Sequence, residues 1–443
     1  MLVSVSEPIE SIHDPVAAVL AARQYGEPWF CLEQPARAGS VVAGLGATTW
    51  IAGGDGPDRF ALAQARWLEL CERAVGDHPA GPPGCGLIAV GGFPFAPGGA
   101  VSPAWEGFDG GHALQVPELA LAAREGELWL TLCDQVHASD SAEAVVARIE
   151  SSRSRLRATA LPLRDPAPVG RFTVHSTMAP EHYEQAVAQA VAKIRSGELE
   201  KVVLAREVGV QGPAPFDPGT VFGGLRESFP ECFIYAVGRE EKCFTGATPE
   251  LLVRREGERA ATVALAGTAR RSEDSTLDRH LGQELLSSEK NLHENLIVAK
   301  RIAAELEPFS VWVTFSPEPQ LIKVTNVQHL AIPIRAQLKD GAGALRLAGA
   351  LHPTPAVGGE PGPLAQRLIP ALEGFDRGWY AGTVGWTDAG GDGEFCVALR
   401  CALLQGHSAA CYAGAGIVDG SEPGAELAET EFKLRAMLSA LIS

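Results

Sequence analysis

Short apolar segments recur along the chain after residue 200, and the first of them, 201–210, is rich in β-branched residues. Gly, Pro or charged residues separate each segment from the next, and each segment has the length of a strand rather than of a long helix, so each is predicted to be a strand. These segments are 201–210, 232–237, 251–255, 258–265, 379–386, 394–404 and 409–418. Two long helical patterns stand out among them, at about 278–306 and about 424–441. Meandering strands with a few long helices predict an α+β protein with large antiparallel sheets flanked by helices.

The chain has 443 residues, enough for one large domain or two ordinary ones. The Pro-rich stretch ALPLRDPAPVGR (160–171) is the best candidate for a boundary, which would divide the chain into 1–165 and 166–443. The first part carries short apolar segments between Gly/Pro clusters, and a helix is predicted from Ser141, a serine suited to an N-cap. We expect the two parts to form one compact domain.

Charge and composition exclude several classes of protein. The formal net charge is −17, and such a surface repels nucleic acid and acidic lipid. No stretch approaches the ~20 apolar residues of a membrane-spanning helix, and the N-terminus lacks the basic and apolar runs of a signal peptide, which predicts a cytoplasmic protein. The nine cysteines include no CxxC pair, and Cys396, Cys401 and Cys411 are predicted to be buried free thiols. An anionic substrate could bind only where a metal or converging Lys and Arg reverse the field.

Acidic residues on the two long helical patterns suggest where a metal could bind. Glu426, Glu429 and Lys433 are spaced by three and four residues, so they share one helix face. By spacing alone this face is more simply a solvated one, and Glu294 on the other pattern is equally ordinary. Carboxylates on two helices would suit Mg²⁺, which takes one or two protein carboxylates and leaves other positions to water and substrate. No Cys/His cluster indicates zinc.

A set of longer motifs resembles one family along about residues 170–440. In chain order they are KVVLAR (201–206), GATPELL (246–252), ALAGTARR (264–271), SEKNLHEN (288–295), QHL (328–330), LHPTPAVGGEP (351–361), FDRGWYAG (375–382), FCVALR (395–400) and YAGAGIV with ELAETEFKL (412–434). This order resembles the chorismate-utilising enzymes, which include isochorismate synthases, salicylate synthases, anthranilate synthase large subunits and aminodeoxychorismate synthases. The resemblance implies the fold of anthranilate synthase component I, and residues 1–165 match it only loosely.

The resemblance also implies ligands for a metal and for the substrate. Glu294 and Glu429 match the magnesium ligands of the family, with Glu426 close by, and the metal would hold the ring carboxylate of chorismate. Further positions match residues around the two substrate carboxylates and the ring. They are Tyr380, Arg400 and Lys433 for the enolpyruvyl carboxylate, Gly267, Thr268, Gly414 and Gly416 as backbone donors, and His329 beside the ring. Without the family, His329 would more simply be a core histidine.

Two residues imply the reaction. Lys201 matches the position where water-using members carry lysine and ammonia-using members typically carry glutamine. Lys201 opens an apolar strand, where desolvation favours the neutral amine that a base requires, although a lysine at a sheet edge is the simpler interpretation outside the motif. Glu250 matches the general acid. The resemblance therefore implies a reversible conversion of chorismate to isochorismate, with water attacking C2 and the C4 hydroxyl leaving.

Alternatives within the group remain open. Ala356 stands where salicylate synthases, which go on to eliminate pyruvate, tend to carry threonine; Asn295 stands where part of the family carries histidine. An amine-transferring relative is disfavoured by Lys201, and a non-catalytic chorismate-binding module is disfavoured because every expected acid, base and ligand is present. The family implies a monomer that binds chorismate and isochorismate without a glutaminase subunit, for menaquinone or siderophore biosynthesis.

Overall fold

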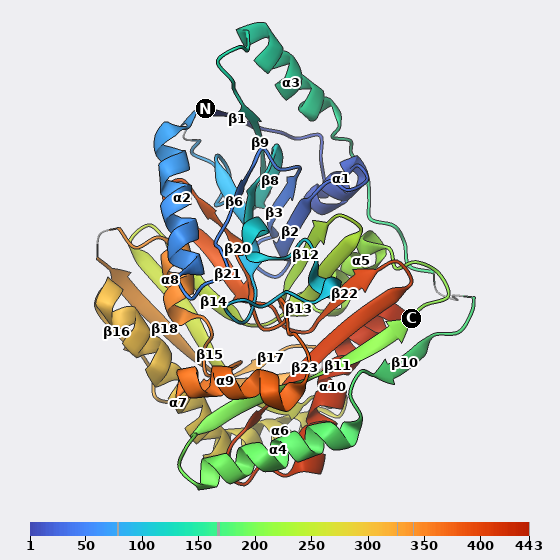
Figure 1. The fold of residues 1–443 in the computed structure, drawn as a ribbon, viewed down its shortest axis with the longest axis vertical. Coiled ribbons are helices and arrows are strands. Elements are labelled where there is room, and N and C mark those ends of the chain that lie inside the picture. The colour runs from blue at the N-terminus through green and yellow to red at the C-terminus, as the bar shows by residue number, and fades with distance from the viewer. Residues whose placement is uncertain (78, 166–168, 326, 340, 443) are drawn as a thin grey trace.

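Two large β-sheets form the framework of the protein (Figure 1). The computed structural model describes residues 1–77, 79–165, 169–325, 327–339 and 341–442. Thirteen strands form the first sheet, in the order β10-β11-β23-β22-β13-β12-β2-β3-β8-β9-β1-β5, with β19 paired to β11. Ten strands form the second, in the order β16-β18-β15-β14-β21-β20-β6-β7-β4, with β17 paired to β18. Neighbouring strands pair antiparallel, apart from β1 and β5, as the segment pattern predicted.

The strands of the first sheet are β1 (Leu2–Pro8), β2 (Trp29–Gln34), β3 (Ser40–Leu45), β5 (Val75–Gly76), β8 (Leu119–Arg124), β9 (Glu127–Gln135), β10 (Thr173–Ser176), β11 (Lys201–Gln211), β12 (Phe233–Arg239), β13 (Lys242–Thr248), β19 (Gly359–Glu360), β22 (Cys401–Gln405) and β23 (Ser408–Ile417). Those of the second sheet are β4 (Thr49–Ile51), β6 (Ile88–Phe93), β7 (Leu114–Val116), β14 (Leu251–Glu256), β15 (Arg259–Arg270), β16 (Ser310–Phe315), β17 (Gln320–Lys323), β18 (Val327–Leu338), β20 (Thr383–Asp388) and β21 (Gly393–Val397). Strands from both sides of the 160–171 connector therefore occur in both sheets, which supports our proposal that 1–165 and 166–443 form one folding unit.

The helices are α1 (Pro15–Ala22), α2 (Arg59–Arg73), α3 (Ala142–Ser154), α4 (Pro180–Arg195), α5 (Pro218–Ser228), α6 (Ser275–Ser287), α7 (Glu289–Leu306), α8 (Ala344–Leu351), α9 (Gly362–Glu373) and α10 (Pro423–Ile442), with short 3₁₀ turns at Pro103–Trp105, Gly110–His112 and Glu307–Phe309. Helices α4, α9 and α10 pack around β11 and β23, and α7 packs on β15 and β18 (Figure 1). The serine predicted to cap α3 does so, since Ser141 accepts a hydrogen bond from the Ala144 N–H. Helix α3 lies at one end of the molecule, at the top of Figure 1, and none of its side chains is buried.

The predicted long helix at about 278–306 is in fact two helices. Helix α6 ends at Ser287 and α7 starts at Glu289, with Ser288 between them in an extended conformation. The Ser288 side chain accepts a hydrogen bond from the Asn291 N–H, so it caps α7 while it terminates α6. Residues on both sides of Ser288 favour a helix, which is why the sequence pattern did not show the break.

The predicted strand 394–404 is also two strands, and these belong to different sheets. Strand β21 ends at Val397 in the second sheet, β22 begins at Cys401 in the first, and Arg400 between them has a φ of 50°. The link between β13 and β14, which contains Glu250, crosses between the same two sheets. The two crossings are hydrogen-bonded to each other, from the Val397 N–H to the Glu250 carbonyl (3.0 Å) and from the Ala247 N–H to the Arg400 carbonyl (3.2 Å). The predicted strand 379–386 is shorter than expected, because it begins only at Thr383.

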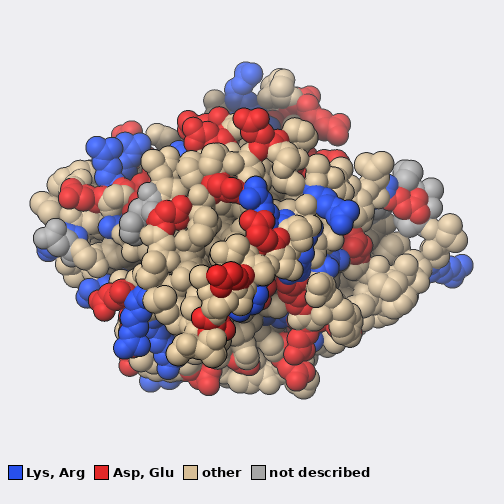
Figure 2. Space-filling model, turned by 90° about the horizontal axis from the view of Figure 1, so that it is seen from above, with Lys and Arg blue, Asp and Glu red and all other residues tan. Residues whose placement is uncertain are grey.

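Apolar side chains from the facing surfaces of the two sheets form the larger hydrophobic core. Phe30 and Tyr235 contribute from the first sheet, and Phe93 and Phe395 from the second; all four are buried. The cysteines are free thiols, and Cys396, Cys401 and Cys411 are buried as predicted. No helix in the described part of the chain is both long enough and apolar enough to cross a membrane. On the face drawn in Figure 2, Lys and Arg lie in small groups among Asp and Glu.

A buried ion pair fixes β11, the strand that starts with Lys201. Glu373 and Arg377 are paired at 2.5 Å and both side chains are almost fully buried. Glu373 also accepts a hydrogen bond from the Ala205 N–H (2.7 Å), and Arg377 donates to the Val203 carbonyl (2.9 Å). Both partners therefore hold β11 in place through its backbone.

Replacing Arg377 by leucine is expected to lower the free energy of unfolding by about 3–5 kcal/mol, because it leaves the Glu373 carboxylate buried without its partner. Urea unfolding of wild type and variant measures this change. Arg73→Leu is the matched control, because Arg73 also pairs with a glutamate four residues away, but on the exposed surface of α2. This substitution should change the urea midpoint of unfolding little. Equal effects of the two substitutions would contradict the role given to the buried pair.

Candidate active site

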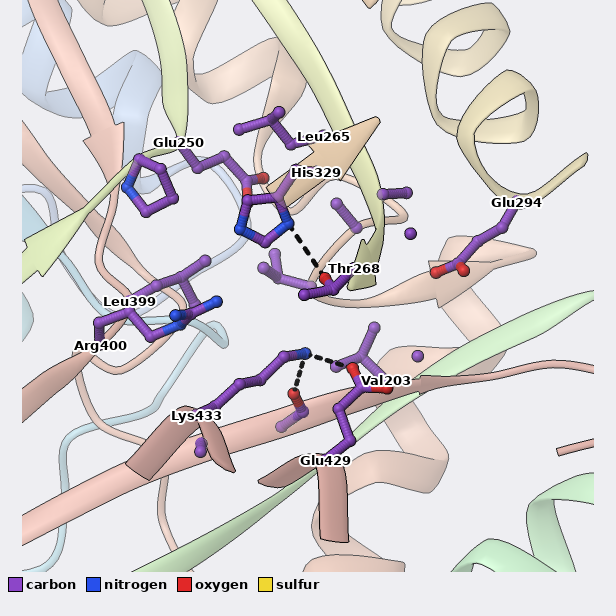
Figure 3. Close-up of a pocket in the computed structure, with 18 of the residues that line it drawn as sticks. Val203, Glu250, Leu265, Thr268, Glu294, His329, Leu399, Arg400, Glu429 and Lys433 are labelled. Carbon is purple, nitrogen blue, oxygen red and sulfur yellow. Dashed lines mark hydrogen bonds and ion pairs between the residues drawn. The ribbon is translucent and has the colours of Figure 1, made fainter. Parts of the chain in front are cut away.

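A pocket opens where the two sheets meet α7 and α10, with an empty volume of about 920 Å³ counted out to its mouth. Its lining includes all fourteen residues that the sequence singled out. They are Lys201, Glu250, Gly267, Thr268, Glu294, His329, Ala356, Tyr380, Arg400, Gly414, Gly416, Glu426, Glu429 and Lys433. Figure 3 shows the labelled side chains Glu250, His329, Arg400, Lys433, Glu294 and Glu429 around one space.

Lys201 enters the pocket from the first residue of β11. Its side chain is only 1% exposed, and its Nζ lies 2.6 Å from Glu294 Oε1. Gly416 on β23 makes room for this pair, since a Cβ there would lie 2.6 Å from Glu294 Oε1 and 3.1 Å from Lys201 Cε. A lysine at this strand end is therefore fully enclosed, rather than lying at a solvated sheet edge.

Glu250 reaches the same pocket from the crossing between β13 and β14. Burial raises the pKa of its carboxyl to about 7, and the positive charges of Lys201, Lys433 and Arg400 oppose part of that rise. A carboxyl with this pKa is protonated in a large fraction of molecules at neutral pH, so it can donate a proton. Its environment is the one that a general acid requires.

Three carboxylates from two helices gather at the other side of the pocket. Glu294 belongs to α7, and Glu426 and Glu429 belong to the first two turns of α10. Burial raises the pKa of Glu429, but Lys433, Lys290 and Arg400 outweigh it and the pKa lies below its ordinary value. Glu429 is therefore ionised at neutral pH, as a metal ligand must be.

This donor set fits a divalent cation of the magnesium type. Among the described residues no three His, Cys, Asp or Glu side chains form a ready-made metal cage. Two carboxylates beside an open pocket are nevertheless what Mg²⁺ commonly uses, because it keeps several water or substrate oxygens in its coordination sphere. Glu294 and Glu429 are the two carboxylates that would hold it. In the structure they are paired with Lys201 and Lys433, so a bound cation would either displace these lysines or lie beside them.

Cations and a tyrosine line the part of the pocket next to Glu429. Lys433 Nζ lies 2.7 Å from Glu429 Oε1 and donates a hydrogen bond to the Gly414 carbonyl at 2.8 Å (Figure 3). The rings of Tyr380 and Tyr412 are stacked, with their centroids 5.4 Å apart. A Cβ at Gly414 would lie 2.8 Å from the Tyr380 hydroxyl, so glycine leaves room for this side chain. The Arg400 guanidinium points into the same space from the sheet crossing. An anion such as a carboxylate could be held here by an Arg fork and a lysine.

His329 on β18 and the paired segment of β15 around Gly267 and Thr268 form another wall of the pocket. A register shift in β15 leaves Gly267 between the paired residues Ala266 and Thr268, with a φ of 79° that favours glycine. The Thr268 hydroxyl and His329 Nδ1 are hydrogen-bonded at 3.0 Å. Burial, together with Arg400 and Lys433, lowers the pKa of His329 to about 3, so the imidazole is neutral.

Asn295, which follows Glu294, faces away from this pocket. Its side-chain amide donates hydrogen bonds to the carbonyls of Ala264, Ala266 and Leu330, at 3.3, 3.1 and 2.9 Å. Asn295 thus ties α7 to β15 and β18 and fixes the turn of helix that carries Glu294. Asparagine at this position supports the pocket without taking part in its lining.

Some pocket residues were missed by the sequence analysis. The apolar walls include Val203, Leu265 and Leu399, and the charged residue Lys290 lines the pocket beside Glu426. Lys290 precedes Glu294 by four residues in SEKNLHEN, so both lie on one face of α7. That spacing was a signal that could have found Lys290.

Comparison with known proteins identifies the family. The family described as chorismate binding enzyme matches residues 1–442, almost the whole chain. The chain belongs to this family. The salicylate biosynthesis isochorismate synthase of Pseudomonas aeruginosa is 40% identical to this chain, and the match covers 88% of this chain and 80% of that protein. The isochorismate synthase MenF of Bacillus subtilis is 32% identical over 100% of this chain and 93% of its own length.

A solved structure has the same fold. The structure of MenF from Escherichia coli, described as the menaquinone-specific isochorismate synthase, matches with a TM-score of 0.81 and 28% sequence identity. The match covers 100% of this chain and 95% of that one. The fold expected from the sequence motifs is therefore confirmed, and it extends over residues 1–165, where the motifs matched only loosely.

Proposed function

We propose that the chain is an isochorismate synthase, which converts chorismate to isochorismate reversibly. The observation that carries the proposal is that a fully buried lysine and a buried glutamic acid with a pKa of about 7 line one pocket, together with carboxylates suited to a cation. The names of the relatives support the same activity.

The reaction needs one base and one acid, and we assign them to Lys201 and Glu250. The Lys201 amine takes a proton from a water molecule as the water oxygen bonds to C2 of the ring. Both ring double bonds shift, from C1=C2 and C5=C6 to C1=C6 and C4=C5, and the C4–O bond breaks. Glu250 gives its proton to the departing hydroxyl, which leaves as water. One water enters and one leaves, so atoms and charge balance. The lysine is then protonated and the glutamate ionised, which are the starting forms for the reverse reaction.

Other residues hold the substrate, which carries two carboxylates. Arg400, Lys433 and Tyr380 would bind the enolpyruvyl carboxylate, and the backbone near Gly267 and Gly416 would donate to the carboxylates. Glu294 and Glu429 would hold Mg²⁺, with Glu426 close by. When bound, the ion would supply positive charge for the ring carboxylate. The neutral His329 would lie beside the ring without adding charge.

Ala356 supports isochorismate as the end product, because it lines the pocket where pyruvate-eliminating relatives tend to carry threonine. We further propose that the protein is a cytoplasmic monomer without a glutaminase subunit, and that its product serves menaquinone or siderophore biosynthesis.

Incubation with chorismate and Mg²⁺, followed by chromatography of the products, tests the activity. Isochorismate is the expected product. A mixture dominated by salicylate and pyruvate, an aminated product in the presence of ammonium, or no turnover would overturn the proposal.

The pKa of Glu250 predicts how kcat/KM changes with pH. The productive pair carries one proton in total, on Glu250 for the forward reaction and on Lys201 for the reverse. Below about pH 7 the pair holds a second proton, which titrates with the pKa of Glu250, and no base is available. We therefore expect kcat/KM to rise with pH and to level off above about pH 7. The forward and reverse directions must share this profile, because the overall equilibrium neither consumes nor releases a proton.

Rates of chorismate and isochorismate consumption, measured from about pH 5.5 to about pH 8.5, test this profile. Glu426→Gln is the control, because it removes the nearby carboxyl whose pKa burial also raises and should leave the rise near pH 7 in place. A forward kcat/KM that falls as the pH passes through 7 would contradict the assignment of Glu250.

A further inference from the structure

Lys290 and Glu426 form an ion pair between α7 and α10 at the edge of the pocket. Lys290 Nζ lies 3.5 Å from Glu426 Oε1 and 3.5 Å from the hydroxyl of Ser421. The Lys290 side chain is 44% exposed, whereas that of Glu426 is only 7% exposed. The lysine therefore lies between solvent and a buried carboxylate that itself borders the pocket.

Each carboxylate of the proposed cation site has its own lysine. Lys201 pairs with Glu294 at 2.6 Å, Lys433 with Glu429 at 2.7 Å, and Lys290 with Glu426 at 3.5 Å. The first two lysines also have roles in the reaction that we propose, as base and as substrate ligand. Lys290 has no such role, and its position on Glu426 is the one feature of this cluster that the mechanism leaves unexplained.

The charges in the pocket show what Lys290 contributes. Lys201 and Glu250 share one proton in the proposed reaction, so together they add no net charge on whichever of them the proton lies. The remaining charges are the cations Lys290, Arg400 and Lys433 and the anions Glu294, Glu426 and Glu429. Three cations and three anions cancel, so a doubly charged cation and a dianionic substrate can enter together without leaving a net charge. Loss of Lys290 would make the same site one unit more negative.

On the basis of the proposed function, we propose that Lys290 is a positioning and specificity-determining residue. Its ion pair with Glu426 keeps this carboxylate from binding the cation. In the proposed reaction Lys201 is the base and Lys433 binds the substrate, which releases Glu294 and Glu429 for the cation. Lys290 has no such role, so it stays on Glu426 and keeps the pocket near neutrality for a dianion. A third free carboxylate would favour a cation with more oxygen ligands, such as Ca²⁺, over Mg²⁺. It would also repel the substrate carboxylates.

The inference predicts opposite changes in two affinities for Lys290→Gln. The affinity for a divalent cation should rise, and the affinity for chorismate should fall, each by about three- to tenfold, as expected for one charge at a partly solvated site. Glu426→Gln should do the reverse, because it leaves Lys290 unpaired. The double variant Lys290→Gln with Glu426→Gln should lie near wild type in both affinities, since it removes one charge of each sign.

Calorimetric titration with Mg²⁺ and with Ca²⁺, in the absence of substrate, measures the first affinity, and the KM for chorismate at saturating Mg²⁺ measures the second. Lys300→Gln is the matched control, because Lys300 is an exposed lysine on the same helix and lies outside the pocket lining. A merely structural role for Lys290 would move both affinities in the same direction. That result, or no change in either affinity, would overturn the inference.

The cation titration needs no turnover, so its outcome is separate from that of the product assay. If the wild type forms isochorismate but Lys290→Gln binds cations as the wild type does, the proposed function stands and the role of Lys290 is rejected. If the wild type forms no isochorismate from chorismate, the proposed function is rejected whatever the titration shows.

Discussion

Replacing Lys201 by alanine is expected to lower kcat for the formation of isochorismate by about 10³- to 10⁴-fold. General base catalysis contributes about 10²- to 10⁴-fold in enzymes, and a water molecule without a base at C2 is a poor nucleophile. The substitution removes no proposed ligand of the substrate, so chorismate should still bind. It also frees Glu294 from its 2.6 Å ion pair, so the cation should bind at least as tightly as in the wild type.

Lys201→Arg separates the charge of the lysine from its chemistry. Arginine keeps a positive charge beside Glu294 but cannot be deprotonated in a protein, so it cannot act as a base. It should therefore be as inactive as the alanine variant. Lys242→Arg is the matched control, because Lys242 is another buried strand lysine and lies outside the pocket lining, and this variant should keep its turnover. Substantial activity of Lys201→Arg would reject the base assignment.

The sequence was sufficient to predict the class of fold because the strands are marked locally. The apolar segments 201–210 and 409–418 form neighbouring antiparallel strands, β11 and β23, and the pattern at about 424–441 forms α10. The pattern failed where tertiary contacts determine the backbone. Nothing in 394–404 marks the change of sheet at Arg400, because the segment contains no Gly or Pro and its left-handed residue is an arginine.

The site itself could not be derived from spacing. Lys201, Glu250, Glu294 and Arg400 lie far apart along the chain, and each by itself looks like an ordinary strand or helix residue. The resemblance to a family grouped them, and the fold explains the grouping, because Glu250 and Arg400 occupy two crossings between the same sheets. The ion pair of Lys290 with Glu426 depends on where the fold places the start of α7 relative to the start of α10, which no local pattern encodes.

Replacing Glu429 by alanine is expected to weaken Mg²⁺ binding more than about 100-fold. Loss of an outer partner of a metal ligand typically costs about 10–100-fold in metal affinity, and loss of the ligand itself should cost more. The substitution also leaves Lys433 without its 2.7 Å partner, and this unpaired cation beside Arg400 repels a second positive ion. Turnover at moderate Mg²⁺ concentration should fall accordingly.

Metal titration of Glu429→Ala by calorimetry checks this effect without relying on activity, and Glu431→Ala is the matched control. Glu431 lies two residues further along α10, is 59% exposed, and is outside the pocket lining, so its loss should leave the titration unchanged. Chorismate binding measured without metal should not weaken in Glu429→Ala, because the variant removes a negative charge from a pocket that binds a dianion. A single variant thus moves metal and substrate affinity differently, which general damage to the fold would not do. Unchanged Mg²⁺ affinity in Glu429→Ala would show that the cation is held elsewhere.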